Sequence, residues 1–329
     1  MDEGSPPMAK PTSAARPRSE GQPPSSSVRP LAALRKWGGF VRFSHTVFAL
    51  PFALAAMLVA AREHRGWPGW RTFGLILAAM VCARTCAMAF NRIVDRKFDA
   101  LNPRTANRHL PAGAISLLSA ALLCGLSGVG LVAASYFLNP LCFWLSPVAL
   151  IVICFYSLTK RFTDYTHVFL GVALALAPIG AWLAVKGPGV SVLEIIQMIV
   201  LAVTVVLWLV GFDIIYALQD YEFDKAHGLR SLVVAWGPKN ALAAAFLAHV
   251  AMCGLLLAFG VLTFGPRCFA YLVGWFIILV CLTLEHWIAR RRSLNWINLA
   301  FFRLNALVSL VFLAVTAAEV IFRGGFRLR

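Results

Sequence analysis

Long apolar runs recur along most of the chain, and short polar stretches separate them. An α-helix needs about 20 predominantly apolar residues to cross a bilayer. The pattern predicts about nine such helices, at approximately residues 40–61, 72–94, 115–137, 141–158, 168–185, 193–218, 241–264, 269–288 and 297–322. We therefore expect an all-α membrane protein built as a bundle of transmembrane helices.

The first 34 residues do not follow this pattern. They are rich in Pro, Ser, Ala and Arg and contain few large apolar side chains. Such a segment cannot bury enough apolar surface to fold, so we expect residues 1–34 to be a disordered tail before one transmembrane domain at residues 35–329. No apolar core precedes a small-residue cleavage site, so we expect no secretory signal.

The most informative polar residues lie where the second apolar run ends. Asn91, Asp95 and Asp99 recur every four residues, a spacing that keeps side chains on one face of a helix. Arg104 and Arg108 follow on a loop that opens with an Asn-Pro pair. Mg²⁺ takes carboxylate oxygens together with phosphate oxygens of a substrate, and Arg binds further phosphate oxygens through its fork of donors. The stretch therefore predicts a site for a magnesium–diphosphate complex.

A second acidic row ends the sixth apolar run. Asp213, Asp220 and Asp224 lie there, and Lys225 and Arg230 follow them. Asp213 lies seven residues before Asp220, two helical turns back, so we expect both on the same helix face. One such row is weak evidence, but two rows can hold Mg²⁺ ions across one diphosphate. The chain lacks the GxxxxGK[ST] and GxGxxG loops of nucleotide sites. We therefore expect a polyprenyl diphosphate whose diphosphate departs, and an electron-rich phenol ring as the acceptor.

Further charged residues lie within or at the ends of the apolar runs. An Arg near mid-membrane costs about 2.5–3.5 kcal/mol, so Arg84 is expected to face an internal polar cavity, either on a ligand or paired with an aspartate. Arg42 is either a ligand contact or an interfacial anchor. Tyr156 and Lys160 share a helix face, and Lys160 and Arg161 are either phosphate contacts or anchors that retain a cytoplasmic loop.

The composition supports a membrane protein. The chain has 329 residues, of which 60% are hydrophobic and 13% charged, and its net charge is +16. In a soluble protein this charge would suggest binding to nucleic acid. Here the Lys and Arg residues are spread over the tail and the loops, so we expect contact with a lipid bilayer and no nucleic-acid partner. With the N-terminus inside, both acidic rows face the cytoplasm. We thus expect a multi-pass protein of the inner (plasma) membrane. Cys82 and Cys86 are expected to be packing residues.

The motifs together resemble those of the UbiA-type family of intramembrane aromatic prenyltransferases, over about residues 40–325. The segments that carry the resemblance are NRIVDRKFD with PRTANRHLPAG, YSLTKR, and DIIYALQDYEFD with GLRS. The resemblance implies a nine-helix bundle around a central cavity with the two aspartate motifs at its cytoplasmic side. It also implies Mg²⁺-dependent transfer from polyprenyl diphosphate to a hydroxylated aryl acid of the 4-hydroxybenzoate class, in ubiquinone or menaquinone biosynthesis.

The resemblance also implies roles for individual residues. The metal ligands would be Asn91, Asp95, Asp99, Asp220 and Asp224. The substrate-binding residues would be Arg42, Arg104, Arg108, Tyr156, Lys160, Arg161, Lys225 and Arg230. The catalytic residues would be Asp213, Tyr216 and Arg84, with Asp213 polarising the phenol or steadying the allylic cation.

Two departures leave the acceptor open. Many 4-hydroxybenzoate members read Asn-Asp where this chain has Asn91-Arg92, and Arg-Pro-Leu where it has Arg108-His109-Leu110. The form FNRIVD with NPRTANRHLPAG resembles a branch that prenylates a hydroxylated naphthoate in an alternative menaquinone route. A haem farnesyltransferase or a chlorophyll-type synthase is disfavoured by the motif DIIYALQD. A transporter with acidic ion sites is disfavoured because the acids lie at helix ends and the halves show no repeat.

Overall fold

The computed structural model of the protein describes residues 35–42, 46–290 and 294–323, and for residues 294–301 and 323 only the backbone. The expected tail, residues 1–34, lies outside these ranges. The chain divides into two units, residues 1–37 and Gly38–Arg329. In the first unit only residues 35–37 are described, and they are helical. All elements considered below belong to the second unit.

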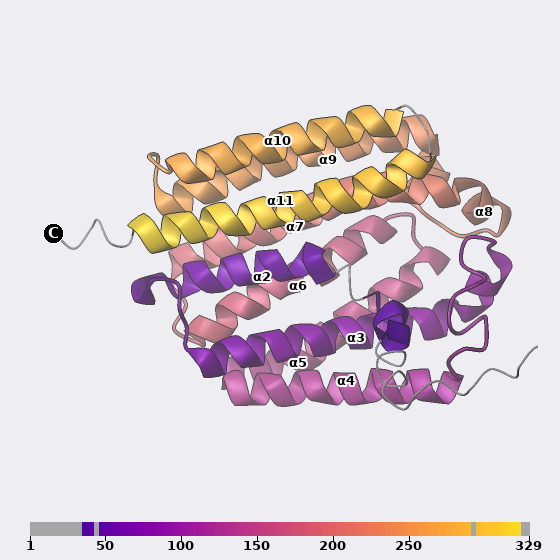
Figure 1. The fold of residues 1–329 in the computed structure, drawn as a ribbon, viewed down its shortest axis with the longest axis horizontal. Coiled ribbons are helices and arrows are strands. Elements are labelled where there is room, and N and C mark those ends of the chain that lie inside the picture. The colour runs from indigo at the N-terminus through magenta and orange to yellow at the C-terminus, as the bar shows by residue number, and fades with distance from the viewer. Residues whose placement is uncertain (1–34, 43–45, 291–293, 324–329) are drawn as a thin grey trace, which may run out of the picture. The chain divides into compact units, whose positions relative to one another are not determined.

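The second unit is built from helices in its described part. The long helices are α2 (Thr46–Ala60), α3 (Trp70–Leu101), α4 (Leu117–Leu138), α5 (Pro140–Phe155), α6 (Thr166–Lys186), α7 (Val192–Ala217), α9 (Leu232–Phe264), α10 (Phe269–Arg290) and α11 (Leu294–Arg323) (Figure 1). The short elements between them are η2 (Arg62–His64), η3 (Tyr156–Arg161), η4 (Leu218–Asp220) and α8 (Tyr221–Ala226).

The expected all-α membrane architecture is confirmed, but the count of nine spans is not. Within the described ranges, eight helices are long and apolar enough to cross a membrane. The first predicted span corresponds to α2, an apolar helix of only 15 residues that contains Pro51. The protein is therefore an integral, multi-pass membrane protein.

Polar side chains define where several of these helices begin. Ser116, Asn139 and Ser231 each accept a hydrogen bond from the backbone N–H three residues later, at the starts of α4, α5 and α9. At the start of α7, Ser191 and Glu194 form a reciprocal capping box. Such caps satisfy backbone donors that a helix start leaves free, which stabilises each helix in a fixed register.

The tightest part of the core surrounds α7. Trp208 of α7 is fully buried and packs on Phe52 of α2, with ring centroids 4.9 Å apart. Gly211 lies where α9 approaches α7, and a Cβ at this position would come within 2.2 Å of the His249 ring. The His249 ring therefore occupies space that only a residue without a side chain leaves free.

Polar segments gather at one end of the bundle. The loop after α3 and helix α8 lie at the same end in Figure 1. The backbone N–H of Arg230, just after α8, donates to the carbonyl of Lys160 in η3 over 2.9 Å. Three segments that are far apart in the sequence are thereby brought together around the site described next.

Candidate active site

A cavity of about 670 Å³ lies among α2 to α7. Both aspartate rows and several basic side chains line its polar end. Apolar side chains of α3, α5 and α6 line the rest, among them Met80, Leu145 and Leu176. The cavity thus combines a strongly charged end with an apolar region, as a ligand with a charged head and a hydrocarbon chain requires.

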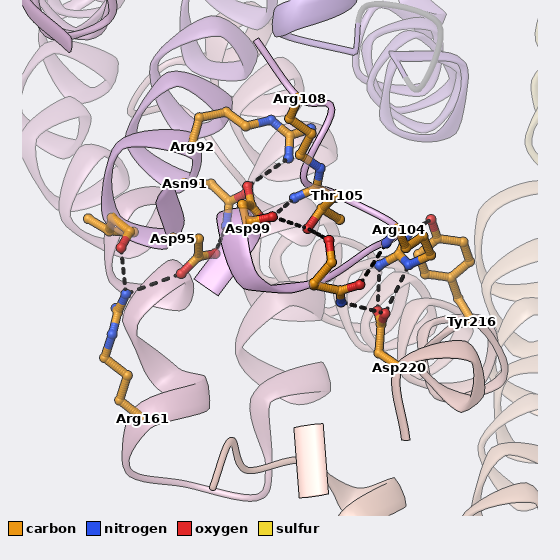
Figure 2. A network of polar contacts seen from close by, with 12 residues as sticks. Asn91, Arg92, Asp95, Asp99, Arg104, Thr105, Arg108, Arg161, Tyr216 and Asp220 are labelled. Atoms are coloured by element: carbon orange, nitrogen blue, oxygen red, sulfur yellow. Dashed lines mark hydrogen bonds and ion pairs between the residues drawn. The ribbon is translucent and has the colours of Figure 1, made fainter. Parts of the chain in front are cut away.

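The first aspartate row lies on one continuous helix, as its spacing predicts. Helix α3 extends to Leu101, and Asn91 Nδ2 donates to Asp95 Oδ2 over 2.9 Å. Asp95 Oδ1 also accepts from Arg161 at 3.1 Å, which links α3 to η3. Asp99 contacts both Arg108 and Arg92, whose guanidinium groups lie close together in Figure 2. The nitrogen–oxygen distances are 2.6 Å to Arg108 and 3.8 Å to Arg92.

The second row lies on a broken helix. Helix α7 ends at Ala217, the turn η4 carries Asp220, and α8 carries Asp224. The expected alignment of Asp213 with Asp220 on one regular helix is therefore interrupted by this turn. Asp224 is almost fully buried, and its partner is Lys160 at 3.4 Å.

Arg104 connects the loop after α3 to the second row. Its Nε donates to Asp220 Oδ1 over 2.9 Å, its Nη2 contacts Oδ2, and its Nη1 donates to the Tyr216 hydroxyl over 3.1 Å (Figure 2). Asn102 also donates to Asp220. Burial opposes the charge of Arg104, but its hydrogen bond to Asp220 and the Tyr216 and Asp220 charges raise its pKa above the ordinary value. The guanidinium is therefore firmly cationic.

Four of the five aspartates of the two rows have an Arg or Lys partner among the described residues, and Asp213 contacts His167 instead. The pairs are Asp95–Arg161, Asp99–Arg108, Asp220–Arg104 and Asp224–Lys160. A buried carboxylate is tolerated only when a cation or hydrogen bonds compensate it. In each pair the positive side chain offsets the cost of burying the carboxylate.

The side chains of the site could supply only some of the ligands that a Mg²⁺ ion needs. No cluster of three or more His, Cys, Asp or Glu side chains with metal-binding geometry occurs in the described part of the chain. Mg²⁺, however, commonly uses one or two carboxylates and completes its shell with water and substrate phosphates. Asp99 Oδ2 is buried and has no hydrogen-bond partner among the described residues. The aspartates therefore suit a Mg²⁺–phosphate complex better than an all-protein metal cage.

Most of the other predicted site residues also line the cavity. Arg42, Arg84, Tyr156 and Asp213 all do so. Arg84 Nη2 lies 3.5 Å from the carbonyl oxygen of Arg42. No ion pair between Arg84 and an aspartate occurs among the described residues. Of the two alternatives for Arg84, a contact with a ligand in the cavity therefore stays the prediction.

Two predicted substrate-binding residues lie outside the cavity lining. The ammonium of Lys225 lies 5.7 Å from the centre of the Tyr221 ring. Arg230 Nη1 donates to the carbonyl of Phe162 over 3.0 Å. Both belong to the same end of the bundle, but neither lines the cavity.

The sequence interpretation missed several residues of the site. Arg92 is 5% exposed and contacts Asp99, and Thr105 Oγ1 donates to the Asp99 carbonyl over 3.0 Å. His167 is 1% exposed, and its Nδ1 lies 2.6 Å from Asp213 Oδ2. Since 46 residues separate His167 from Asp213, no local spacing signalled their contact.

Comparison with known proteins identifies several that this chain resembles. Residues 49–307 match the UbiA prenyltransferase family. A 4-hydroxybenzoate octaprenyltransferase of Alcanivorax borkumensis is 35% identical over 211 residues, which are 64% of this chain and 70% of that protein. The apo structure of a UbiA homolog from Aeropyrum pernix superposes with a TM-score of 0.73 at 32% identity, over 85% of this chain and 98% of that one. A UbiA homolog from Archaeoglobus fulgidus, bound to GPP and Mg²⁺, shares the fold, with a TM-score of 0.64 at 23% identity over 87% and 99%.

Proposed function

Because the chain belongs to the UbiA prenyltransferase family, we propose that it transfers a polyprenyl group from polyprenyl diphosphate to the ring of a hydroxylated aryl carboxylic acid of the 4-hydroxybenzoate class. The product would serve ubiquinone or menaquinone biosynthesis. The observation that carries the proposal is the single cavity with two paired aspartate rows at one end and apolar walls beyond them. The relatives named 4-hydroxybenzoate octaprenyltransferase support the acceptor class.

The donor binds with its diphosphate at the polar end and its hydrocarbon chain along α3, α5 and α6. The residues that would hold Mg²⁺ are Asn91, Asp95, Asp99, Asp220 and Asp224. When bound, Mg²⁺ neutralises the diphosphate and makes it a better leaving group. The UbiA homolog bound to GPP and Mg²⁺ supports this cofactor.

The basic partners of the aspartates would exchange ligands when the donor enters. Arg104, Arg108, Lys160 and Arg161 lie within 3.4 Å of an aspartate oxygen. When the aspartates bind Mg²⁺, the Arg and Lys side chains become free to bind the phosphate oxygens. Negative charge develops on these oxygens as the diphosphate leaves. The same residues thus stabilise the free protein and the departing group in turn.

The acceptor binds beside the first carbon of the prenyl chain. Arg42 and Arg84 would hold its carboxylate, while Asp213, Tyr216 and Tyr156 face the ring. A ring hydroxyl activates the adjacent carbon towards the allylic cation. Lys225 and Arg230 lie outside the lining, so we propose that they act only through positive charge near the entrance.

The site would face the cytoplasm from an inner (plasma) membrane. Arg104, Arg108, Lys160 and Arg161 lie at the end of the bundle that carries the aspartate rows, and basic loops are retained on the cytoplasmic side. Mg²⁺ and phosphorylated metabolites are found there. The location of the acids at this end, together with the family, favours an enzyme over a transporter with acidic ion sites.

A dihydroxynaphthoate is the second candidate acceptor. It is favoured by buried Arg92, which lies where many 4-hydroxybenzoate members read Asp. The test is a panel of aryl acids, including 4-hydroxybenzoate and dihydroxynaphthoates, with one labelled polyprenyl diphosphate and purified protein in lipid vesicles. Label in a prenylated aryl acid supports the function and identifies the acceptor. Absence of product with every acid contradicts it.

A further inference from the structure

His167 is buried and contacts Asp213, the one aspartate of the cavity that has no Arg or Lys partner among the described ion pairs. The side chain of His167 is 1% exposed and that of Asp213 is 23% exposed. Both residues line the cavity. Asp213 therefore faces the acceptor region, and the imidazole supports it from the protein side.

Close packing of α6 on α7 fixes this pair. A Cβ on Gly171 of α6 would lie 3.0 Å from the carbonyl oxygen of Val206 of α7, so the two helices approach backbone to backbone. His167 lies four residues before Gly171, and Asp213 lies seven residues after Val206. These spacings keep each residue on the contacting face of its helix. The 2.6 Å contact between Nδ1 and Oδ2 is thus set by rigid elements.

The hydrogen-bond chemistry of the pair determines where the protons lie. An ionised carboxylate only accepts, so the Nδ1–H of His167 donates to Asp213 Oδ2. His167 Nε2 is buried and has no hydrogen-bond partner among the described residues. A second proton there would place an unpaired, charged donor in the interior, which is costlier than an unpaired acceptor. The arrangement favours a neutral imidazole beside an ionised Asp213.

With Asp213 as the group that acts on the phenol of the aryl acid and receives its proton, we infer from this geometry that His167 is the positioning residue that holds the carboxylate for this role. The inference rests on the proposed function and assigns His167 to it. With Oδ2 engaged by His167, Oδ1 remains for the phenolic O–H. Removing that proton as the allylic cation approaches increases the nucleophilicity of the adjacent ring carbon.

The electrons and protons balance in this step. The allylic C–O bond breaks and its electron pair leaves with the diphosphate, while a ring π pair forms the new C–C bond. The phenolic proton passes to Asp213 and leaves a dienone. The ring-carbon proton then passes to the departed diphosphate, and Asp213 returns its proton to the phenolic oxygen, which restores the aromatic ring and the ionised carboxylate.

Three substitutions of His167 separate positioning from packing. His167→Leu removes both nitrogens, His167→Asn retains a donor at the place of Nδ1, and His167→Gln moves the amide to the place of Nε2. With 4-hydroxybenzoate we expect kcat to fall about 10- to 100-fold in His167→Leu, and the KM for the donor to stay unchanged. His167→Asn should recover most of kcat and His167→Gln should not. His64→Leu, an exposed histidine of η2, is the matched control and should match the wild type.

A more acidic acceptor separates a positioning role from a packing role, because a packing defect should lower kcat equally with both acceptors. The phenol of a ring-fluorinated 4-hydroxybenzoate ionises more readily and needs less help from a base, so the defect of His167→Leu should shrink to about threefold or less. An equal defect with both acceptors, or equal recovery by Asn and Gln, overturns the inference. If His167→Leu does not fold, the comparison of Asn with Gln still decides. Failure of the wild-type protein with every aryl acid would instead overturn the proposed function, and the inference with it.

Discussion

Arg108 Nη1 lies 2.6 Å from Asp99 Oδ1. In a loaded site these two groups would bind different partners, the carboxylate a metal ion and the guanidinium a phosphate. The same is true of Arg104 with Asp220 and of Lys160 with Asp224. The pairs therefore describe a resting state in which the protein supplies both the anions and the cations of the future complex.

Exchange of these partners makes metal and diphosphate binding synergistic. Mg²⁺ alone must compete with Arg and Lys for the carboxylates, and diphosphate alone must compete with the carboxylates for Arg and Lys. We expect either ligand alone to change the melting temperature little and both together to raise it clearly, because binding to the folded state stabilises it. Thermal unfolding in detergent with MgCl₂, inorganic diphosphate or both measures this. Additive shifts from the two ligands would contradict the exchange.

Removal of one basic partner of the aspartates should weaken the binding and slow the turnover of polyprenyl diphosphate. Arg108→Ala or Lys160→Ala deletes a charge that would face the phosphates, which should cost about 1.5–3 kcal/mol, or roughly ten- to a hundred-fold in kcat/KM for polyprenyl diphosphate. Steady-state kinetics with varied donor gives the value. Arg71→Ala is the control, since the exposed Arg71 donates to the Phe137 carbonyl and neither residue lines the cavity. Unchanged donor kinetics would show that these residues only anchor the loops.

Replacement of Arg42, the cavity arginine proposed to hold the carboxylate, should affect the aryl acid and not the polyprenyl diphosphate. Arg42→Ala should raise the KM for the aryl acid about ten-fold or more and leave the donor KM unchanged, because a charge-assisted contact to the carboxylate is lost. Kinetics with varied acid at saturating donor tests this. Wild-type turnover of uncharged phenols as fast as of the acids would refute carboxylate recognition.

The contact between α7 and α9 allows a test of the fold. A Cβ at Gly211 would come within 2.2 Å of His249, so Gly211→Ala should destabilise the protein by about 1–3 kcal/mol or more, through overpacking. Gly254→Ala is the matched control in α9, because a Cβ there meets no atom within 4 Å. Melting temperatures of the two variants in the same detergent measure the difference. An equal stability of Gly211→Ala and the wild type would show that α9 is not packed this closely on α7.

The sequence allowed prediction of the parts that depend on local periodicity. The apolar runs predicted most of the long helices within about three residues at each end, but they missed the start of α2, the end of α3 and the start of α9 by more. Steps of four placed Asn91, Asp95 and Asp99 on one face of α3. The second row was less regular than expected because η4 interrupts the helix between Asp213 and Asp224. Such a break depends on tertiary contacts, here Arg104 and Asn102 binding Asp220 from another segment.

Pairings between distant segments could not be predicted. The partner of each aspartate, the burial of Arg92 and the contact of His167 with Asp213 arise from helix packing and leave no spacing in the sequence.

The most direct measurement is product formation by Asp95→Ala and Asp220→Ala, with labelled polyprenyl diphosphate, Mg²⁺ and the aryl acid that the wild type accepts. Asp95 belongs to the first row and Asp220 to the second, and the two rows hold one diphosphate only through cations. We expect the wild type to form a labelled, prenylated aryl acid, and EDTA or either substitution to abolish it, although both variants remain folded in membranes. Glu63→Ala, which changes an exposed acid that pairs with Lys186, should retain full activity. Near-normal turnover by either aspartate variant would contradict the two-row site.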